Sequence, residues 1–213
     1  MTTPNVGHTP LDEVNNEGDL YFAQIDSGAN TCEFYVNHLK FANMSTFPAD
    51  EFKDLTEANA EYIKNFKYSD LTGVAQRGVA IVTCMDSRIN PLSVVGMRSG
   101  DAKILRNAGA RVTEDVLRTL VLATYLLGVK RILIMPHTQC RMAENTEEEI
   151  HATIDKQFGV NTSSLEFRTT NDQLGALAKD VNRVRSYPLL NQGVVVGGAI
   201  YDVKTGSVTP IDC

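Results

Sequence analysis

Residues 79–88 read VAIVTCMDSR, and this stretch decides the fold class. Its first five residues, which follow Gly78, are apolar or β-branched without the alternation of a half-exposed strand. A continuous run of this kind is typical of a strand covered on both faces, as in a parallel sheet. The run ends abruptly in the polar and reactive side chains of Cys84, Asp86 and Arg88.

The pattern continues on the C-terminal side with alternating strands and helices. Further strands are predicted at Lys103–Arg106, Arg131–Pro136, Gln192–Tyr201 and Ser207–Ile211. Helices are predicted after Thr113, over Thr146–Phe158 and over Asn171–Ser186, where apolar residues recur at three- and four-residue spacings. Strands alternating with helices of this length predict an α/β fold, with a mostly parallel central sheet flanked by helices.

The N-terminal side differs in composition. Residues 1–48 are rich in Asn, Thr and Gly, and we interpret them as an extension with one short helix around Glu33–Leu39. Their aromatic residues favour packing on another surface, for example a partner subunit. A helical pattern starts at Ala49, so residues 49–213 are predicted to form the α/β domain.

Composition excludes several classes of function. The chain has 213 residues, with 20 Lys+Arg against 26 Asp+Glu and a net charge of −6. An acidic chain without a basic tract has no electrostatic hold on nucleic acid or on an anionic membrane. No apolar run reaches the length of a spanning helix, and the start lacks the pattern of a secretory leader. Four cysteines are too few for a disulfide scaffold, so we expect a reduced, cytoplasmic protein.

Metal-ligating side chains follow two of the predicted strands. Cys84 comes directly after one strand, and His137 and Cys140 follow another. The carboxyl ends of parallel strands meet at one sheet edge, where ligands bind in open α/β folds. A Cys₂His set suits Zn²⁺ and leaves one tetrahedral position open, as in catalytic zinc sites.

Other readings of these side chains stay open at this point. Cys84 followed by Arg88 gives a Cys-x₃-Arg spacing, which is too short for a phosphatase phosphate loop. A thiol–imidazole dyad of Cys84 and His137 leaves Cys140 without a role. Both cysteines can also be small buried apolar residues.

Asp86 has two options of its own. It can complete the zinc coordination as a fourth ligand, or it can pair with Arg88 in a bidentate contact. In the second case the fourth position is left to water.

The motifs CMDSR and HTQC, whose first residues lie 53 positions apart, together with RNAG between them, resemble the β-class carbonic anhydrases. The resemblance covers about residues 55–211 and is to the small bacterial and archaeal-type branch, which includes carbonyl sulfide and carbon disulfide hydrolases. It implies one Zn²⁺ per chain, in a homodimer or homotetramer, and a small neutral gas as substrate. The implied zinc ligands are Cys84, His137 and Cys140, the implied catalytic pair is Asp86 and Arg88, and the implied substrate pocket includes Asn107, Ala108 and Gly109.

The activity that the resemblance implies is hydration of CO₂ to bicarbonate by a zinc-bound hydroxide. The alternative is hydrolysis of carbonyl sulfide or carbon disulfide at the same zinc site, releasing H₂S. A third reading is a zinc-binding regulatory protein without turnover. One departure from the family is Arg141, at a position where glycine is common, and Gln139 stands where this branch often has Asp. We therefore expect a different loop around Cys140.

Overall fold

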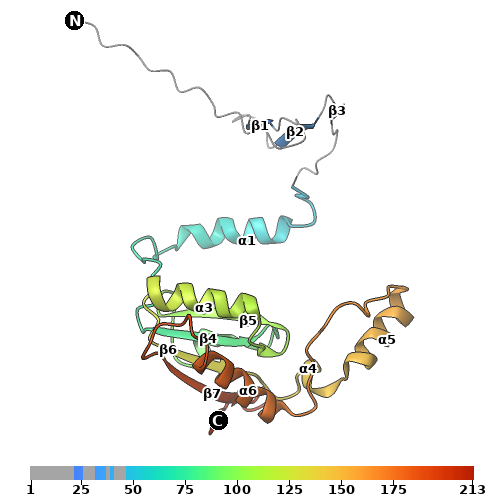
Figure 1. The fold of residues 1–213 in the computed structure, drawn as a ribbon. Helices are drawn as coiled ribbons and strands as arrows, with labels where there is room; N and C mark the ends of the chain where they lie inside the picture. Colours follow the sequence, from blue (N-terminus) through green and yellow to red (C-terminus); the bar gives the residue numbers. More distant parts are fainter. Residues whose placement is uncertain (1–21, 26–31, 37–38, 41–46) are drawn as a thin grey trace, which may run out of the picture. The chain divides into compact units, whose positions relative to one another are not determined.

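The computed structural model describes residues 22–25, 32–36, 39–40 and 47–213, with the backbone alone for the first three ranges. The chain divides into two compact units, Met1–Lys67 and Tyr68–Cys213 (Figure 1). The sequence placed the boundary at residue 48, whereas the first unit also includes the helix that follows. The proposed packing of the extension on a partner subunit concerns side chains outside the described residues and stays a prediction.

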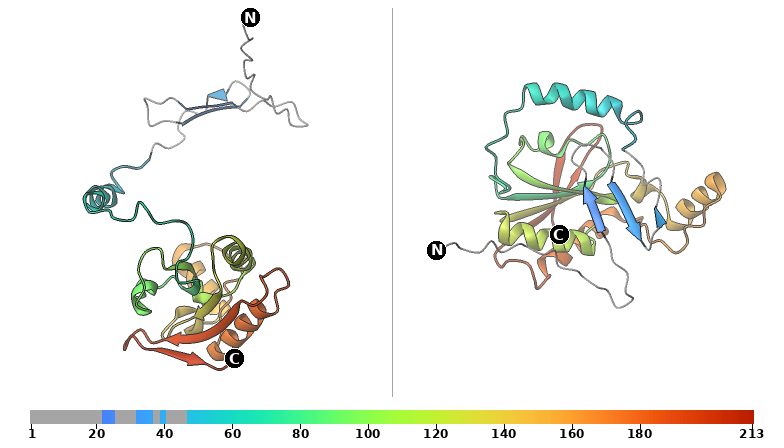
Figure 2. Two further views of the ribbon diagram at one scale, coloured as in Figure 1. Left: turned by 90° about the vertical axis from the view of Figure 1, so that its left-hand side faces the viewer. Right: turned by 90° about the horizontal axis from the view of Figure 1, so that it is seen from above.

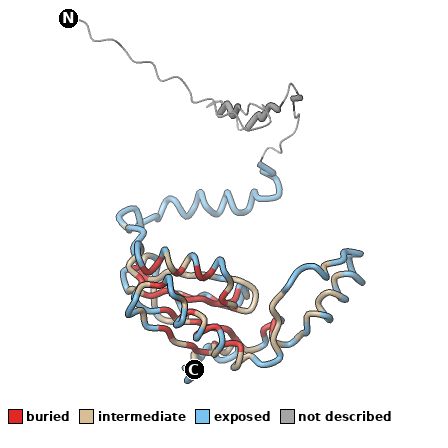
Figure 3. Tube along the Cα trace, viewed as in Figure 1, coloured by how far each residue is buried: buried red, intermediate tan, exposed pale blue. Residues whose placement is uncertain are grey.

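The described part of the first unit contains a small antiparallel sheet and one helix. The strands are β1 (Phe22–Ile25), β2 (Cys32–Val36) and β3 (Leu39–Lys40), in the order β1-β2-β3. The short helix predicted around Glu33–Leu39 is therefore wrong. Aromatic and β-branched residues at 34–36 favour a strand once a partner strand is available, and β1 provides it. The helix α1 (Lys53–Lys64) confirms the helical pattern, and every one of its residues is exposed (Figure 3).

The second unit contains a five-stranded sheet in the order β5-β4-β6-β7-β8. Four strands are parallel and β8 is antiparallel to β7. The strands are β4 (Val79–Cys84), β5 (Ala102–Asn107), β6 (Arg131–Met135), β7 (Val195–Tyr201) and β8 (Val208–Ile211). All six residues of β4 are buried, as the unbroken apolar run predicts. The mostly parallel α/β sheet is thus confirmed.

Helices cover the two faces of this sheet unequally. The helices are α2 (Pro91–Val94), the 3₁₀ turn η1 (Ala108–Ala110), α3 (Glu114–Leu126), α4 (Arg141–Glu144), α5 (Glu147–Phe158) and α6 (Gln173–Arg185). The long helices α3 and α6 pack on the same face, where their apolar residues form one core with alternate residues of β4 and β6 (Figure 2). The opposite face is covered only in part, by α2 and the loops beside it, and it keeps an open apolar groove of about 270 Å³ lined by Ile81, Leu133 and Val195 among others.

Chain direction makes the junction of β4 and β6 special. From β4 the chain crosses to β5 on one side, and from β5 it returns past β4 to β6 on the other. Such a reversal leaves a crevice outside the carboxyl ends of the two strands, which is where ligands bind in open α/β sheets. Among the helices of the described residues, none is long and apolar enough to cross a bilayer.

The helix α5 and the segment that returns from it stand out from the rest of the second unit (Figure 1). Thr146 and Glu149 form a reciprocal capping box at its start. The Glu147 carboxylate accepts hydrogen bonds from the backbone N–H groups of Phe167 and Thr169, at 2.9 and 3.0 Å. These two hydrogen bonds lower the pKa of Glu147, and the bond from Phe167 contributes most. The carboxylate therefore ties the returning segment to the first turn of α5.

The first prediction concerns the glycine pair in β7. A Cβ at Gly198 would lie 2.9 Å from the Cys213 sulfur and 3.1 Å from Leu177, which is buried, whereas a Cβ at Gly197 meets nothing within 4 Å. We expect Gly198→Ala to lower the free energy of unfolding by about 1–3 kcal/mol through overpacking. Gly197→Ala is the matched control in urea unfolding. Equal stability of the two variants would contradict this account.

The second prediction concerns pH. Because the folded state lowers the pKa of Glu147, its carboxylate stabilises the fold above the usual pKa of about 4.3, and this contribution is lost as the pH falls further. Glu147→Gln should therefore cost roughly 1 kcal/mol at pH 7, and the cost should shrink below about pH 4. The neighbouring Glu148→Gln changes the same charge in the same helical turn and is the control. Urea unfolding at several pH values measures both, and a pH-independent difference would contradict the assignment.

Candidate metal centre

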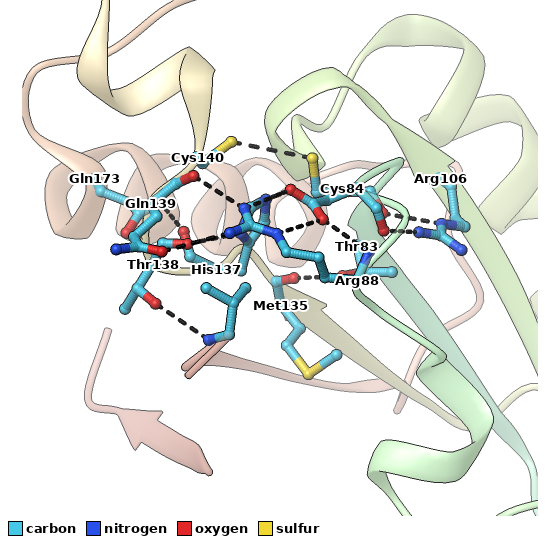
Figure 4. Close-up of polar contacts among 12 residues, drawn as sticks. Thr83, Cys84, Arg88, Arg106, Met135, His137, Thr138, Gln139, Cys140 and Gln173 are labelled. Carbon is cyan, nitrogen blue, oxygen red and sulfur yellow. Dashed lines mark hydrogen bonds and ion pairs between the residues drawn. The ribbon is translucent and has the colours of Figure 1, made fainter. Parts of the chain in front are cut away.

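Three ligand-type side chains meet at the carboxyl ends of β4 and β6. Cys84 is the last residue of β4, His137 lies two residues beyond the end of β6, and Cys140 precedes α4 as its N-cap. One ligand atom from each lies within 4.8 Å of the other two, and all three residues are buried. The two sulfur atoms are 3.9 Å apart (Figure 4). The structure thus brings together the three residues that the strand ends predict.

The orientation of His137 is set by its backbone neighbour. Its Nδ1 lies 2.8 Å from the carbonyl oxygen of Thr138, so Nδ1 carries the proton and donates it. The other ring nitrogen, Nε2, then has a free lone pair. It is fully buried and has no hydrogen-bond partner among the described residues. An orphaned buried nitrogen beside two sulfur atoms is the arrangement that a metal ion satisfies.

The spacing of the donors fits zinc. Two thiolates bound at about 2.3 Å and at a tetrahedral angle lie about 3.8 Å apart, close to the observed 3.9 Å. The donor set of two sulfurs and one imidazole is also one that zinc prefers. The residues could therefore hold a Zn²⁺ ion with one coordination position left over.

The two thiols influence each other strongly. A hydrogen bond from Cys140 foremost, with further hydrogen bonds from the backbone N–H groups of Gly109 and Asp86, lowers the pKa of Cys84. The neighbouring Cys84 thiolate, together with burial, raises the pKa of Cys140. The two shifts have opposite directions, so the first sulfur to ionise opposes ionisation of the second, and a bound divalent cation would favour the ionised form of both.

The loop after β5 supports the Cys84 sulfur. Gly109 has a left-handed φ of 76°, which glycine adopts without strain, and its N–H stabilises the Cys84 thiolate. The side-chain amide of Asn107 closes this loop by donating to the carbonyl of Arg111 at 2.7 Å and accepting from its N–H at 2.9 Å. Ala108 packs, partly buried, against the apolar cluster that contains Cys84. Of the three predicted pocket residues, Asn107 thus has its polar group engaged within the loop.

Asp86 is paired with Arg88. The guanidinium Nε donates to Oδ1 at 2.9 Å and Nη2 donates to Oδ2 at 2.7 Å, and the Arg88 backbone N–H adds a bond of 2.9 Å to Oδ1. This side-chain contact holds the pKa of Asp86 well below its usual range. The carboxylate Oδ2 still lies only 3.8 Å from His137 Nε2. Of the two options that the sequence left open, the structure has the Arg88 pairing.

Two further residues hold the site in shape: Arg106, which the sequence marked only as the first residue of the RNAG motif, and Gln173, which it did not single out. Arg106 donates to the carbonyls of Cys84 at 2.9 Å and Asp86 at 2.6 Å, and Gln173 donates to the carbonyl of His137 at 2.9 Å (Figure 4). Their targets are backbone atoms, which leave no pattern of side-chain types. The parallel register of β4 and β5, which places Arg106 opposite Thr83, is the signal that locates Arg106.

The loop around Cys140 explains how Arg141 is accommodated. Arg141 is the first residue of α4 and takes a helical conformation, so this position does not require glycine. The left-handed backbone falls instead at Gln139, with a φ of 57°.

Comparisons with known proteins identify the family of this chain. The family model described as carbonic anhydrase matches residues 79–208. Beta-carbonic anhydrase 1 of Mycobacterium tuberculosis is 30% identical over 159 residues, which cover 74% of this chain and 96% of that protein. The chain belongs to the β-carbonic anhydrase family. The resemblance seen in the motifs is confirmed.

Further relatives show the range of this family. The crystal structure of a carbonic anhydrase from Streptococcus mutans is similar with a TM-score of 0.71 and 35% identity, covering 76% of this chain and 97% of that one. The carbon disulfide hydrolase of Saccharolobus solfataricus is 32% identical over 152 residues, covering 61% of this chain and 74% of that protein. The family of this chain therefore includes proteins named for two different substrates.

Proposed function

We propose that this chain is a zinc-dependent enzyme that hydrates CO₂ to bicarbonate, with one Zn²⁺ per chain held by Cys84, His137 and Cys140. The observation that carries the proposal is the buried, unpartnered Nε2 of His137 beside two sulfur atoms 3.9 Å apart. A carboxylate that stays ionised lies 3.8 Å from the same nitrogen. A structural zinc site needs four ligands but no such carboxylate, so the combination favours catalysis.

Zinc at this position would supply a bound water whose pKa is lowered to about 7. Asp86 would act on that water. Because Arg88 holds the Asp86 carboxylate ionised and turned into a bidentate contact, Oδ2 can accept a hydrogen bond without becoming a zinc ligand. Such a hydrogen bond would let the Asp86 carboxylate orient the water that zinc supplies.

The rest of the site would exclude water and shape the substrate pocket. The donors are buried and their neighbours include Ala108, Met135 and Met142, which suits an uncharged, linear substrate. We propose that Asn107, Ala108 and Gly109 form one wall of the pocket, with Asn107 keeping the loop closed. We also propose a reduced, cytoplasmic setting and a homodimer or homotetramer as the working form.

A second candidate activity uses the same residues. The similarity to carbon disulfide hydrolase favours hydrolysis of carbonyl sulfide or carbon disulfide with release of H₂S. Both substrates are linear and apolar like CO₂ but larger, so access to the site decides between them.

The third prediction tests the metal site. Cys84→Ser should lower zinc affinity by more than about 10-fold, the loss already expected for disturbing an outer-shell partner of a zinc ligand. Cys213→Ser, which changes a cysteine outside the cluster, should leave zinc binding unchanged. Native mass spectrometry measures zinc per chain and the number of chains together. A Cys84→Ser protein with a full equivalent of tightly held zinc would contradict the assignment of Cys84 as a zinc ligand.

The fourth prediction tests the reaction. The zinc-loaded protein should hydrate CO₂ in stopped-flow assays, and Asp86→Asn, which keeps the shape but removes the ionised acceptor, should lower kcat by about 100-fold with zinc retained. H₂S release from carbonyl sulfide and carbon disulfide is measured on the same preparations. If kcat/KM is larger for H₂S release than for CO₂ hydration, the second activity is the correct one. A zinc-loaded protein without either activity supports a regulatory role.

A further inference from the structure

The loop between His137 and Cys140 is held on both sides of Gln139. The Thr138 N–H donates to the carbonyl of Tyr201 at 2.9 Å, and the Thr138 hydroxyl accepts from the N–H of Val203 at 3.2 Å. On the other side, Cys140 is the N-cap of α4. Gln139 turns the chain between Thr138 and Cys140. Its backbone has a left-handed φ of 57°, which is uncommon for a residue other than glycine. Strained backbone of this kind persists where the surroundings determine it.

The left-handed conformation brings two oxygen atoms of Gln139 to Arg88. Nη1 of Arg88 donates to the side-chain Oε1 at 3.4 Å, and Nη2 donates to the backbone carbonyl at 3.2 Å (Figure 4). Nε and Nη2 of the same guanidinium bind the carboxylate of Asp86. Within residues 47–213, Asp86 and Gln139 are the hydrogen-bond partners of this guanidinium. Arg88 is therefore clamped between them.

Arg88 needs such a second partner. Its side chain is 45% exposed, and a long, exposed cation paired with one carboxylate keeps much of its rotamer freedom. A partner on the adjacent edge of the guanidinium, formed by Nη1 and Nη2, restricts that freedom without adding charge. The amide oxygen of Gln139 is neutral, so it does not compete with Asp86 for the cation.

We propose that Gln139 is a positioning residue that holds Arg88 against Asp86. The inference rests on the proposed function, because Asp86 matters there as the ionised acceptor beside the metal ligands. A glutamate at position 139, which has the same length as glutamine, would have the opposite effect, since its carboxylate would offer the guanidinium a second charged partner and draw it away from Asp86. The neutral side chain at 139 is thus a determinant of how Asp86 is presented.

The fifth prediction compares Gln139→Ala, which removes the side-chain acceptor, with Gln139→Glu, which keeps the shape and adds a charge. The readout is the Arg88 Nε–H signal in the ¹⁵N NMR spectrum of the zinc-loaded protein, assigned by its absence in Arg88→Lys. We expect solvent exchange of this proton to quicken in Gln139→Ala, and its chemical shift to move in Gln139→Glu. In Gln139→Glu, kcat/KM for the active substrate should fall by about 10-fold, the effect of one hydrogen bond to a charged group, with zinc content unchanged.

Gln157→Glu on the exposed α5 makes the same change of charge away from the site, and it should leave the Arg88 signal and the rate unchanged. An Arg88 signal that neither exchanges faster in Gln139→Ala nor moves in Gln139→Glu would overturn the proposal. If Gln139→Glu does not fold, the exchange rate in Gln139→Ala decides. If the wild-type protein has neither activity, the proposed function fails, whereas the NMR readout still decides the role of Gln139.

Discussion

Parallel pairing of β4 with β6 is the constraint on which the rest of the site depends. It brings the end of β4, with Cys84, beside the segment that carries His137, although the two residues are far apart in the chain. The fully buried hydroxyl of Thr83 donates to the carbonyl of Met135 at 2.7 Å and links the two strand ends directly. A slip in this register would separate the sulfur from the imidazole and turn alternate side chains to the wrong face.

Electrostatics then decides how the site is arranged. Two sulfur atoms lie 3.9 Å apart, and a carboxylate lies 3.8 Å from the imidazole beside them. Negative charge gathered in this way is not stabilised by an apolar surrounding. Backbone N–H groups of the loop after β5 compensate one thiolate, and Arg88 compensates the carboxylate. The proposed Zn²⁺ would compensate the rest. Because Arg88 neutralises the Asp86 carboxylate on its own, Asp86 stays beside the three ligand side chains and is not one of them.

Much of this could be predicted from the sequence. The run Val79–Thr83 and the residue types after two strands were enough for the sheet, the strand ends and the three donors, because burial and periodicity are local signals. The helix predicted around Glu33–Leu39 failed because strand pairing overrides a weak local preference. The sequence marked Arg106 through the RNAG motif, but neither its contacts nor those of Gln173 and Gln139 were predicted. These residues bind backbone atoms or a distant guanidinium, and such contacts exist only once the chain is folded. The unequal covering of the sheet also depends on where each crossover passes, which periodicity does not report.

The unpartnered Nε2 of His137 has a consequence for the folding of the protein. A buried polar atom without a partner costs about 1–3 kcal/mol, and that cost is borne by the metal-free fold. Any ion that engages this nitrogen in the folded chain removes the cost and adds its own binding free energy to the stability. With the proposed metal site, the thermal stability of this chain would be linked to the concentration of free metal around it, and its fraction unfolded would become a measure of metal supply.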